Sequence, residues 1–288
     1  ALVLGQCFSD HLVVFVRGKC RLIGRDGNIY ILIQVADVVQ CLVADLIQVC
    51  GSEIQLCVRK TLIQLGNDRI AVQMVQEALP KIPVGTILVD TCGLKGRMVR
   101  DLTYRCQKAG VRYVGTHPMA GREKNGYYAS IPNLFQNANL IVTPVDGTDE
   151  AALDTVKELA KQMGFGKIVT ATPMWHDNMI AYTSQLAHVV SSSYVKDFCM
   201  DDALSFSGGS FQDMTRVATM DESMWALLFL DNRDNLLYHL DLLIENLTDY
   251  RDALKQRDEE RLQYLIAEGR QIQEENVRKR QEQKGELA

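Results

Sequence analysis

The segment Thr116–Gly121 places His117 directly before a proline and shortly before a glycine, at the end of an apolar run. A strand that ends in this way presents one polar side chain to a cleft. Imidazole titrates near neutral pH, so His117 is suited to general acid or base catalysis. A lone histidine in a loop is more often a surface or capping residue, so the assignment depends on the residues around it.

A dinucleotide site of the Rossmann type needs G-x-G-x-x-G after the first strand, so that the backbone can approach a pyrophosphate. The corresponding stretch, Gly5–Asp10, keeps only the first glycine, Gly5, and has an aspartate where the third glycine should stand. Taken alone, this stretch argues against tight dinucleotide binding. Asp26 lies about 20 residues after Gly5, where it either binds a ribose hydroxyl or serves as a turn residue. The sequence supports both readings of Asp26.

A second glycine-bearing segment follows the expected strand Thr86–Asp90. This strand runs directly into Thr91, Cys92 and Gly93. Ligands enter α/β folds at the carboxyl ends of parallel strands. We therefore expect these three residues to line a ligand site.

The composition is that of a globular enzyme, with 288 residues, 47% hydrophobic residues and a net charge of -5. There is no basic footprint for nucleic acid. No apolar run reaches the ~18 residues of a membrane span, and no secretory signal is recognisable, so we expect a cytoplasmic protein. Because the chain starts at Ala1 without Met, inside an expected strand, we expect its natural beginning to lie upstream.

The eight cysteines are scattered singly, with no C-x-x-C pair and no histidine at ligand spacing. This pattern indicates neither a zinc site nor a disulfide framework. We expect buried, reduced thiols and no bound metal.

Short β-rich runs alternate with helical stretches up to residue 172, which is typical of βαβ units and a parallel sheet. We therefore predict an α/β, Rossmann-like dinucleotide-binding domain over residues 1–172. The expected strands that bear on the site are Thr86–Asp90, Val111–Gly115, Leu140–Pro144 and Lys167–Ala171, and the expected helices are Arg69–Leu79, Arg97–Ala109 and Asp149–Met163.

From Pro173 the pattern changes to long helices, expected over His176–Lys196 and almost without a break from Asp221 to the C-terminus. Apolar residues in the second stretch recur at alternating intervals of four and three, which makes a narrow seam. The seam consists of Leu236, Leu240, Leu243, Leu247, Tyr250 and Leu254. It requires a partner helix, either in the same chain or in a second copy. We predict an all-α domain over residues 173–288 that binds substrate and forms a homodimer.

Five segments have the order and spacing of a known family: Asp90–Gly96, Gly115–Gly126, Asn133–Phe135, Thr143–Pro144 and Asp213–Ala218. From about residue 86 to about residue 270 the chain resembles the prephenate dehydrogenase family of tyrosine biosynthesis. The resemblance implies oxidative decarboxylation of prephenate to 4-hydroxyphenylpyruvate with hydride transfer to NAD, NADP being left open. Arogenate is an alternative substrate. A catalytically weak protein that binds prephenate or tyrosine as a regulator is a further alternative.

The resemblance also implies roles for individual side chains. His117 matches the histidine that hydrogen-bonds the ring hydroxyl of the substrate, and Arg216 matches the arginine that holds a substrate carboxylate. His188 and Trp225 match substrate-side residues of the helical domain, with helix packing as the alternative for both. Glu123 matches an acidic residue of a loop that gates the pocket.

The cofactor side departs from the family pattern. The family often has serine beside the nicotinamide where Gly93 stands, so a hydroxyl is absent there, and only the backbone, Thr91 or Cys92 is placed to replace it. The resemblance leaves Gly5 and Asp26 as the remaining cofactor-binding residues, although the first glycine is present without its partners.

The dipeptide His176–Asp177 resembles the family's entry to the helical domain. Capping or hydrogen bonding between the domains explains it as well as chemistry does. The sequence leaves its role open.

Overall fold

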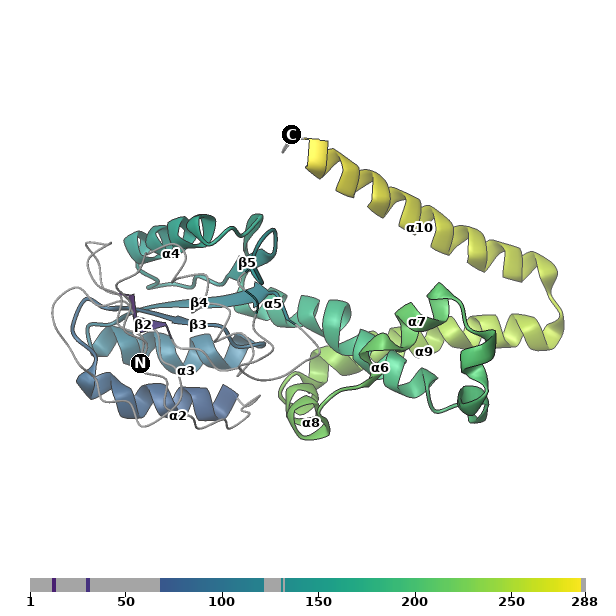
Figure 1. Ribbon diagram of the computed structural model, residues 1–288, viewed down its shortest axis with the longest axis horizontal. Coiled ribbons are helices and arrows are strands. Elements are labelled where there is room, and N and C mark those ends of the chain that lie inside the picture. Colours follow the sequence, from purple (N-terminus) through teal and green to yellow (C-terminus); the bar gives the residue numbers. More distant parts are fainter. Residues whose placement is uncertain (1–11, 14–29, 32–67, 122–130, 132, 286–288) are drawn as a thin grey trace. The chain divides into compact units, whose positions relative to one another are not determined.

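The computed structural model describes residues 12–13, 30–31, 68–121, 131 and 133–285. The chain divides into two compact units, Ala1–Leu236 and Leu237–Ala288. The first unit contains a sheet with helices on both faces, followed by shorter helices (Figure 1). This arrangement confirms the predicted fold class, an α/β domain followed by helices.

The sheet contains six strands in the described part of the chain. Its main path is β3 (Ile87–Asp90), β4 (Arg112–Met119), β5 (Asn139–Val142) and β6 (Lys167–Thr170), and the two-residue strands β1 (Leu12–Val13) and β2 (Tyr30–Ile31) both pair with β3. All of these pairs are parallel except that of β4 with β5. An antiparallel neighbour needs no helical crossover, and residues 133–137 before β5 form a turn. The expected parallel sheet is therefore wrong at this pair.

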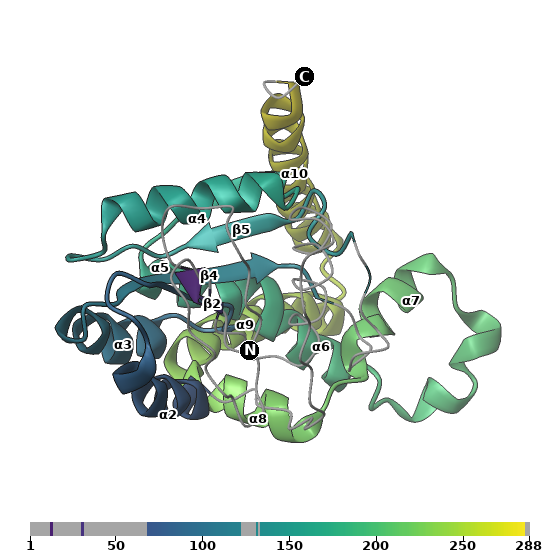
Figure 2. The ribbon, with the colours of Figure 1, turned by 60° about the vertical axis from the view of Figure 1, so that its left-hand side comes forward.

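Helices cover both faces of the sheet. In two views, α2 (Asp68–Ala78) and α3 (Gly96–Lys108) lie on one face and α4 (Glu150–Gln162) lies on the other (Figures 1 and 2). A 3-10 turn, η1 (Leu79–Lys81), follows α2. The core beneath α2 and α3 is apolar and includes Val75, Leu88, Met98, Leu102, Cys106 and Val111. The three helices agree with those expected to within a few residues.

The bounds of α4 have identifiable causes. Asp149 precedes the helix and its carboxylate accepts a hydrogen bond from the backbone N–H of Ala152. Gly164 follows the helix with a φ of 84°, a left-handed conformation that glycine adopts without steric cost.

Strand β4 extends beyond the expected Val111–Gly115, so His117 lies inside a strand and not in a turn. The first half of β4 pairs with β3 and the second half pairs with β5. Hydrogen-bonded and non-hydrogen-bonded pairs alternate along an antiparallel ladder. The N–H of Thr143 donates to the carbonyl of Gly115, which makes this a hydrogen-bonded pair. Pro118 therefore falls at a non-hydrogen-bonded position, where its missing N–H costs no bond to β5.

The predicted helix His176–Lys196 begins earlier and is divided. Helix α5 (Pro173–Ile180) is capped by the hydroxyl of Thr172, which accepts from the N–H of Trp175. A π-helical turn, η3 (Ala181–Gln185), then leads into α6 (Leu186–Tyr194). The remaining elements of this unit are η4 (Phe198–Asp201), η5 (Ala203–Phe206), α7 (Gly209–Thr215), η6 (Arg216–Ala218) and α8 (Glu222–Asp231).

Three helices, α8 and two further ones, replace the almost unbroken helix expected from Asp221 onward. Helix α9 (Arg233–Gln256) ends at Arg257, which has a φ of 55°, and α10 (Glu259–Gly285) follows. The carboxylate of Asp258 accepts from the N–H of Arg261 and so caps α10. Neither glycine nor proline marks this break, which is why the sequence pattern does not predict it.

The close approach of α3 to β4 gives a testable prediction. A Cβ atom on Gly115 would lie 2.6 Å from Oγ1 of Thr143 and 3.0 Å from Cγ2 of Val99. We expect Gly115→Ala to lower the free energy of unfolding by about 1–3 kcal/mol, as overpacking does. Urea denaturation measures this change.

The matched control is Gly121→Ala, because a Cβ on Gly121 has no atom of the described residues within 4 Å. Its stability should stay close to that of the wild type. Equal stabilities of the two variants would contradict the packing described here.

Candidate active site

The imidazole of His117 is hydrogen-bonded to a second imidazole. Its Nδ1 lies 2.8 Å from Nε2 of His176, and the two rings meet edge to face with centroids 5.1 Å apart. His117 comes from β4 and is partly exposed, whereas His176 comes from α5 and is 1% exposed. The structure thus brings together two histidines from separate elements.

The second imidazole is held by a carboxylate. Nδ1 of His176 lies 2.7 Å from Oδ1 of Asp177. The same carboxylate accepts hydrogen bonds of 2.7 Å from the backbone N–H groups of Lys95 and Gly96, at the start of α3. The amino end of a helix favours negative charge, so this position suits an ionised carboxylate.

The hydrogen-bond directions along this chain follow from the carboxylate. An ionised carboxylate only accepts hydrogen bonds, so Nδ1 of His176 carries a proton and donates it to Asp177. In the neutral ring, Nε2 of His176 is then an acceptor, and Nδ1 of His117 donates to it. Nε2 of His117 is left as the nitrogen with the lone pair. That lone pair suits a general base.

Both histidines are neutral near pH 7. Burial lowers the pKa of His117 well below 6.5, and the neighbouring His176 and Lys95 lower it further. Burial also lowers the pKa of His176, with the ammonium of Lys95 adding to this effect and the carboxylate of Asp177 opposing it. A neutral imidazole is the form that accepts a proton.

A buried ion pair lies beneath the histidines. The ammonium of Lys95 donates to Oδ1 of Asp90 and, at 2.6 Å, to the carbonyl of Thr116, and both members of the pair are fully buried. The phenol of Tyr113 donates to Oδ2 of Asp90 at 2.6 Å, and burial and this carboxylate raise the pKa of the phenol. The N–H of Cys92 donates to Oδ1 of Asp90 at 2.9 Å. These bonds fix the end of β3 and the residue that precedes His117.

The three residues predicted after β3 line a buried loop. Cys92 and Thr91 are 0% and 4% exposed, and Oγ1 of Thr91 has no hydrogen-bond partner within the described part of the chain. A Cβ on Gly93 would lie 3.8 Å from a methyl group of Leu228, an ordinary contact distance. The position of Gly93 therefore has room for a Cβ, although glycine supplies no hydroxyl there.

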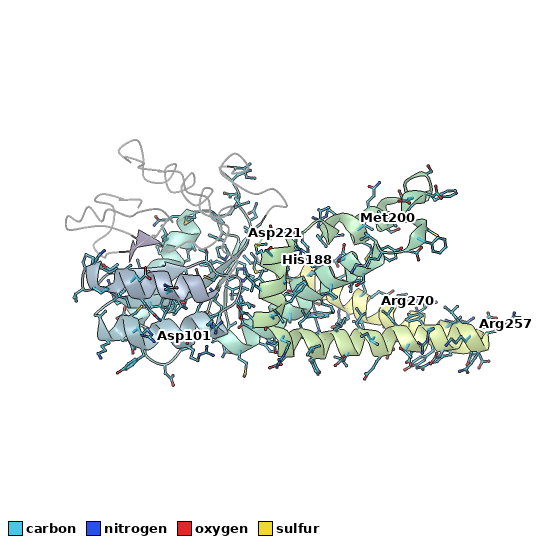
Figure 3. All side chains as sticks on the ribbon, turned by 90° about the horizontal axis from the view of Figure 1, so that it is seen from below. Asp101, His188, Met200, Asp221, Arg257 and Arg270 are labelled. Atoms are coloured by element: carbon cyan, nitrogen blue, oxygen red, sulfur yellow. The ribbon has the colours of Figure 1, made fainter. Side chains whose placement is uncertain are left out.

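The predicted substrate-side residues lie in the helical part of the first unit. The ring of His188, labelled in Figure 3, stacks on that of Trp225 with centroids 3.8 Å apart, and its Nδ1 lies 2.9 Å from the carbonyl of Ser184. Arg216 is exposed and begins η6, a turn that packs against α6, the helix that carries His188. The structure thus brings His188 and Trp225 together and places Arg216 on a neighbouring element.

Hydrogen bonds connect this helical part to Asp177. The side-chain amide of Asn232 donates to the backbone carbonyl of Asp177 and to Oε1 of Gln185, each at 2.8 Å. The amide of Gln185 donates in turn to the carbonyl of Leu228 at 3.1 Å. Helices α5 and α8 and the π-helical turn are therefore joined by buried polar contacts.

Three predicted site residues lie where the structure is not described, and one expectation about the cysteines is wrong. Gly5, Asp26 and Glu123 lie outside the described residues. Cys199 is exposed, so the expectation of buried thiols is wrong there, whereas Cys92 and Cys106 are buried.

The sequence reasoning missed the partnership of His117 with His176 and Asp177. The only local signal was a second histidine directly followed by an aspartate. It also gave no role to Lys95 or Asp90, although a lysine five residues after a strand-terminal aspartate stands within a segment that had been singled out.

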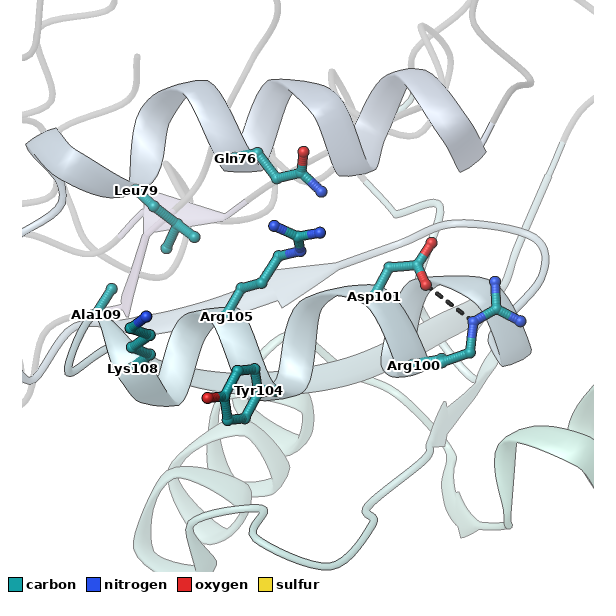
Figure 4. Close-up of a pocket in the computed structure, with 8 residues that line it drawn as sticks. All are labelled: Gln76, Leu79, Arg100, Asp101, Tyr104, Arg105, Lys108 and Ala109. Atoms are coloured by element: carbon teal, nitrogen blue, oxygen red, sulfur yellow. Dashed lines mark hydrogen bonds and ion pairs between the residues drawn. The ribbon is translucent and has the colours of Figure 1, made fainter.

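A separate groove of about 590 Å³ lies along α2 and α3 (Figure 4). Its lining residues are Gln76, Leu79, Arg100, Asp101, Tyr104, Arg105, Lys108 and Ala109. None of them belongs to the hydrogen-bonded cluster around His117, so this groove is distinct from the candidate active site.

Two family models match consecutive segments of the chain. "Prephenate dehydrogenase, nucleotide-binding domain" matches residues 69–170, and "Prephenate dehydrogenase, dimerization domain" matches residues 172–268. The chain belongs to the prephenate dehydrogenase family. Membership confirms the resemblance inferred from the sequence motifs, and it identifies a nucleotide-binding domain followed by a dimerisation domain.

Relatives with assigned activities cover part of the chain. This chain is 32% identical over 181 residues to prephenate dehydrogenase of Bacillus subtilis. The aligned segment covers 61% of this chain and 48% of that protein. This chain is 31% identical over 186 residues to cyclohexadienyl dehydrogenase of Zymomonas mobilis. The aligned segment covers 62% of this chain and 62% of that protein. The chain thus spans less than two thirds of the length of either relative.

Solved structures show the same fold. Prephenate dehydrogenase from Aquifex aeolicus, in complex with hydroxyphenyl propionate and NAD+, has a TM-score of 0.60 and 27% identity over 72% of this chain and 73% of that one. Arogenate dehydrogenase from Synechocystis has a TM-score of 0.61 and 21% identity over 73% and 76% of the two chains.

None of the described helices combines the length and apolar composition that crossing a lipid bilayer requires.

The buried ion pair gives a second prediction. Lys95→Met removes the ammonium and leaves the Asp90 carboxylate buried without its counter-charge, so we expect the free energy of unfolding to fall by about 3–5 kcal/mol. Urea denaturation measures the loss. The control is Arg233→Met, which removes an exposed pair with Asp234 and should change stability little. Equal effects of the two substitutions would contradict a structural role for the buried pair.

The lowered pKa of His176 gives a third prediction. In the unfolded chain this histidine binds a proton near pH 6.5, whereas in the native structure it stays neutral to lower pH. The contribution of His176 to the free energy of unfolding is therefore fully present above pH 6.5, and it falls as the pH drops below that value. The surrounding charged groups are Asp177, Lys95 and Asp90.

Urea titrations at several pH values test this dependence. The fall in stability below pH 6.5 should be smaller in His176→Gln than in the wild type. His239→Gln, on α9, serves as the control and should keep the wild-type dependence. An unchanged slope in His176→Gln would contradict the prediction.

Proposed function

We propose that this protein is an NAD-dependent prephenate dehydrogenase of tyrosine biosynthesis, which converts prephenate to 4-hydroxyphenylpyruvate by oxidative decarboxylation. The observation that carries the proposal is the orientation of His117. Its hydrogen bond to His176 leaves the Nε2 lone pair as the acceptor, on a ring that burial keeps neutral. Family membership and the Bacillus subtilis relative support the choice of reaction.

The cofactor side is assigned to the loop after β3. Thr91 offers a buried hydroxyl without a partner in the described part of the chain, and the backbone at Gly93 leaves room for close approach. These features fit a nicotinamide nucleotide, which would be held by Thr91, Cys92 and Gly93 with Gly5 and Asp26 completing the site. NAD supplies the acceptor for the hydride. The Aquifex aeolicus relative, whose structure contains NAD+, supports NAD over NADP.

His117 has one chemical task in this reaction. As the hydroxyl-bearing ring carbon of prephenate loses hydride, Nε2 of His117 accepts the hydroxyl proton and a carbonyl forms. Loss of the ring carboxylate as carbon dioxide then makes the ring aromatic, and the ring oxygen takes back a proton to give the phenol of 4-hydroxyphenylpyruvate. The remaining residues position the substrate, which carries two carboxylates and one hydroxyl.

Arg216 is proposed to bind one substrate carboxylate, because a guanidinium forms two parallel hydrogen bonds with such a group. The stacked pair of His188 and Trp225 offers an aromatic surface on the neighbouring elements. Glu123 is proposed to lie in a loop that gates the pocket.

A second copy of the chain is proposed to complete the helical domain. The seam residues Leu247 and Leu254 on α9 are 58% and 63% exposed in the single chain. The matched dimerisation domain supports a homodimer through these helices. We also propose a domain boundary between residues 172 and 173. The two matched segments, which meet between residues 170 and 172, support a boundary in this region.

The assay that tests the function measures NADH formation with prephenate and with arogenate, each with NAD and with NADP. Turnover of prephenate with NAD supports the proposal. Turnover of arogenate alone would assign the alternative substrate. Binding of prephenate or tyrosine without any turnover would replace the enzyme by a regulatory binding protein.

The assigned roles give a fourth prediction. His117→Asn should lower kcat by about 10²–10⁴-fold with little change in KM, because the general base is lost while binding contacts remain. Arg216→Ala should instead raise KM about 10- to 100-fold, because a hydrogen bond to a charged group contributes about 1.5–3 kcal/mol. Steady-state kinetics separates the two effects. Wild-type kcat in His117→Asn would remove the assignment.

A further inference from the structure

We propose that His176 and Asp177 form a proton-accepting pair behind His117, so that the substrate proton comes to rest on His176. In this arrangement His117 contacts the substrate, and His176 and Asp177 are positioning residues that act through it. The inference rests on the proposed dehydrogenase function and deepens the description of its site.

The geometry supports transfer in one direction. Nδ1 of His117 and Nε2 of His176 are 2.8 Å apart, and Nδ1 of His176 and Oδ1 of Asp177 are 2.7 Å apart. Both are short enough for hydrogen bonds that carry a proton. Because the Asp177 carboxylate only accepts hydrogen bonds, each donor in the series His117–His176–Asp177 points toward Asp177.

Each proton transfer along the hydrogen-bonded series His117–His176–Asp177 breaks one bond to hydrogen and forms another. The substrate O–H bond breaks and its proton binds Nε2 of His117, while the hydride leaves the ring carbon for the cofactor. The proton on Nδ1 of His117 moves to Nε2 of His176. His117 is then neutral again in its other tautomer, and His176 is a cation beside the Asp177 carboxylate. Loss of carbon dioxide leaves the electron pair of the broken C–C bond on the ring oxygen. The reverse transfers then return the proton through Nε2 of His117 to that oxygen, which becomes the phenol of 4-hydroxyphenylpyruvate.

The charges around the two rings favour His176 as the resting place. Asp177 is the carboxylate bonded to His176, and it favours the protonated ring, whereas the groups that act on His117 are the neighbouring imidazole and the ammonium of Lys95, which disfavour it. The charge of Lys95 is offset locally by Asp90, with which it is paired. A cation on His176 is therefore stabilised more than a cation on His117.

The far end of the pair is rigidly held. The Asp177 carboxylate accepts from two backbone N–H groups of α3, and its backbone carbonyl accepts from Asn232 on the helical side. A Cβ on Gly96 would lie 2.8 Å from Oδ2 of Asp177, so only glycine allows this approach. Such support from both sides is what a fixed proton path requires.

The tautomer of His117 tests the arrangement without any turnover. Nuclear magnetic resonance of the ring nitrogens, in the full-length protein without substrate, distinguishes a proton on Nδ1 from a proton on Nε2. We expect the Nδ1 proton in the wild type and a shift of population toward Nε2 in His176→Phe, which removes the acceptor. A wild-type His117 protonated on Nε2 would overturn the proposal.

Kinetics separates the relay from simple packing. His176→Gln keeps an acceptor oxygen near the position of Nε2 but cannot take up the proton, whereas His176→Phe removes both functions. We expect kcat to fall about 10²–10⁴-fold in the Phe variant, with an intermediate loss in the Gln variant and KM near the wild-type value in both. His239→Gln is the control and should retain wild-type kcat.

A failure of the proton relay through His176 is distinguishable from a failure of the proposed dehydrogenase function. Wild-type kcat in folded His176→Phe would overturn the relay while leaving the dehydrogenase assignment intact. Absence of turnover in the wild type, with the Nδ1 tautomer present, would remove the proposed function but not the geometry of the pair.

Discussion

The carboxylate of Asp177 joins two helices of the first unit, α3 and its own helix α5. It accepts hydrogen bonds from the first N–H groups of α3 and from the imidazole of His176. The amino end of a helix stabilises negative charge there, which offsets the loss of solvent around the carboxylate. Because this group only accepts, its position sets the direction of every hydrogen bond outward to His117. The orientation of the candidate base therefore depends on the contact between α3 and α5.

Lys95 anchors both ends of the same chain of bonds. Its backbone N–H binds Asp177, and its ammonium binds Asp90 and the carbonyl of Thr116, the residue before His117. The separation of the two histidines is thus set through a single residue at the start of α3. A buried ammonium needs such a full set of partners, because an unpaired charge in the interior is strongly unfavourable.

The local sequence pattern predicted much of the framework and the single residue at its centre. Strand β3 and helices α3 and α4 lie close to their expected bounds, because apolar periodicity, Asp149 and Gly164 act locally. The pattern was wrong where tertiary contacts overrode it. Pro118 continues a strand because its partner strand needs no N–H at that position, and α9 ends at Arg257 without a glycine or proline.

The sequence by itself determined the family, the fold class and the choice of His117, because motifs of fixed spacing and local periodicity are written along the chain. Only the tertiary structure decided the partners of that histidine. His117 and His176 are 59 residues apart, and Lys95 and Asp177 are 82 residues apart. Their contact arises from the packing of α3 and α5 at the end of the sheet. The tautomer of an imidazole depends on what lies opposite each nitrogen, and no local pattern specifies that.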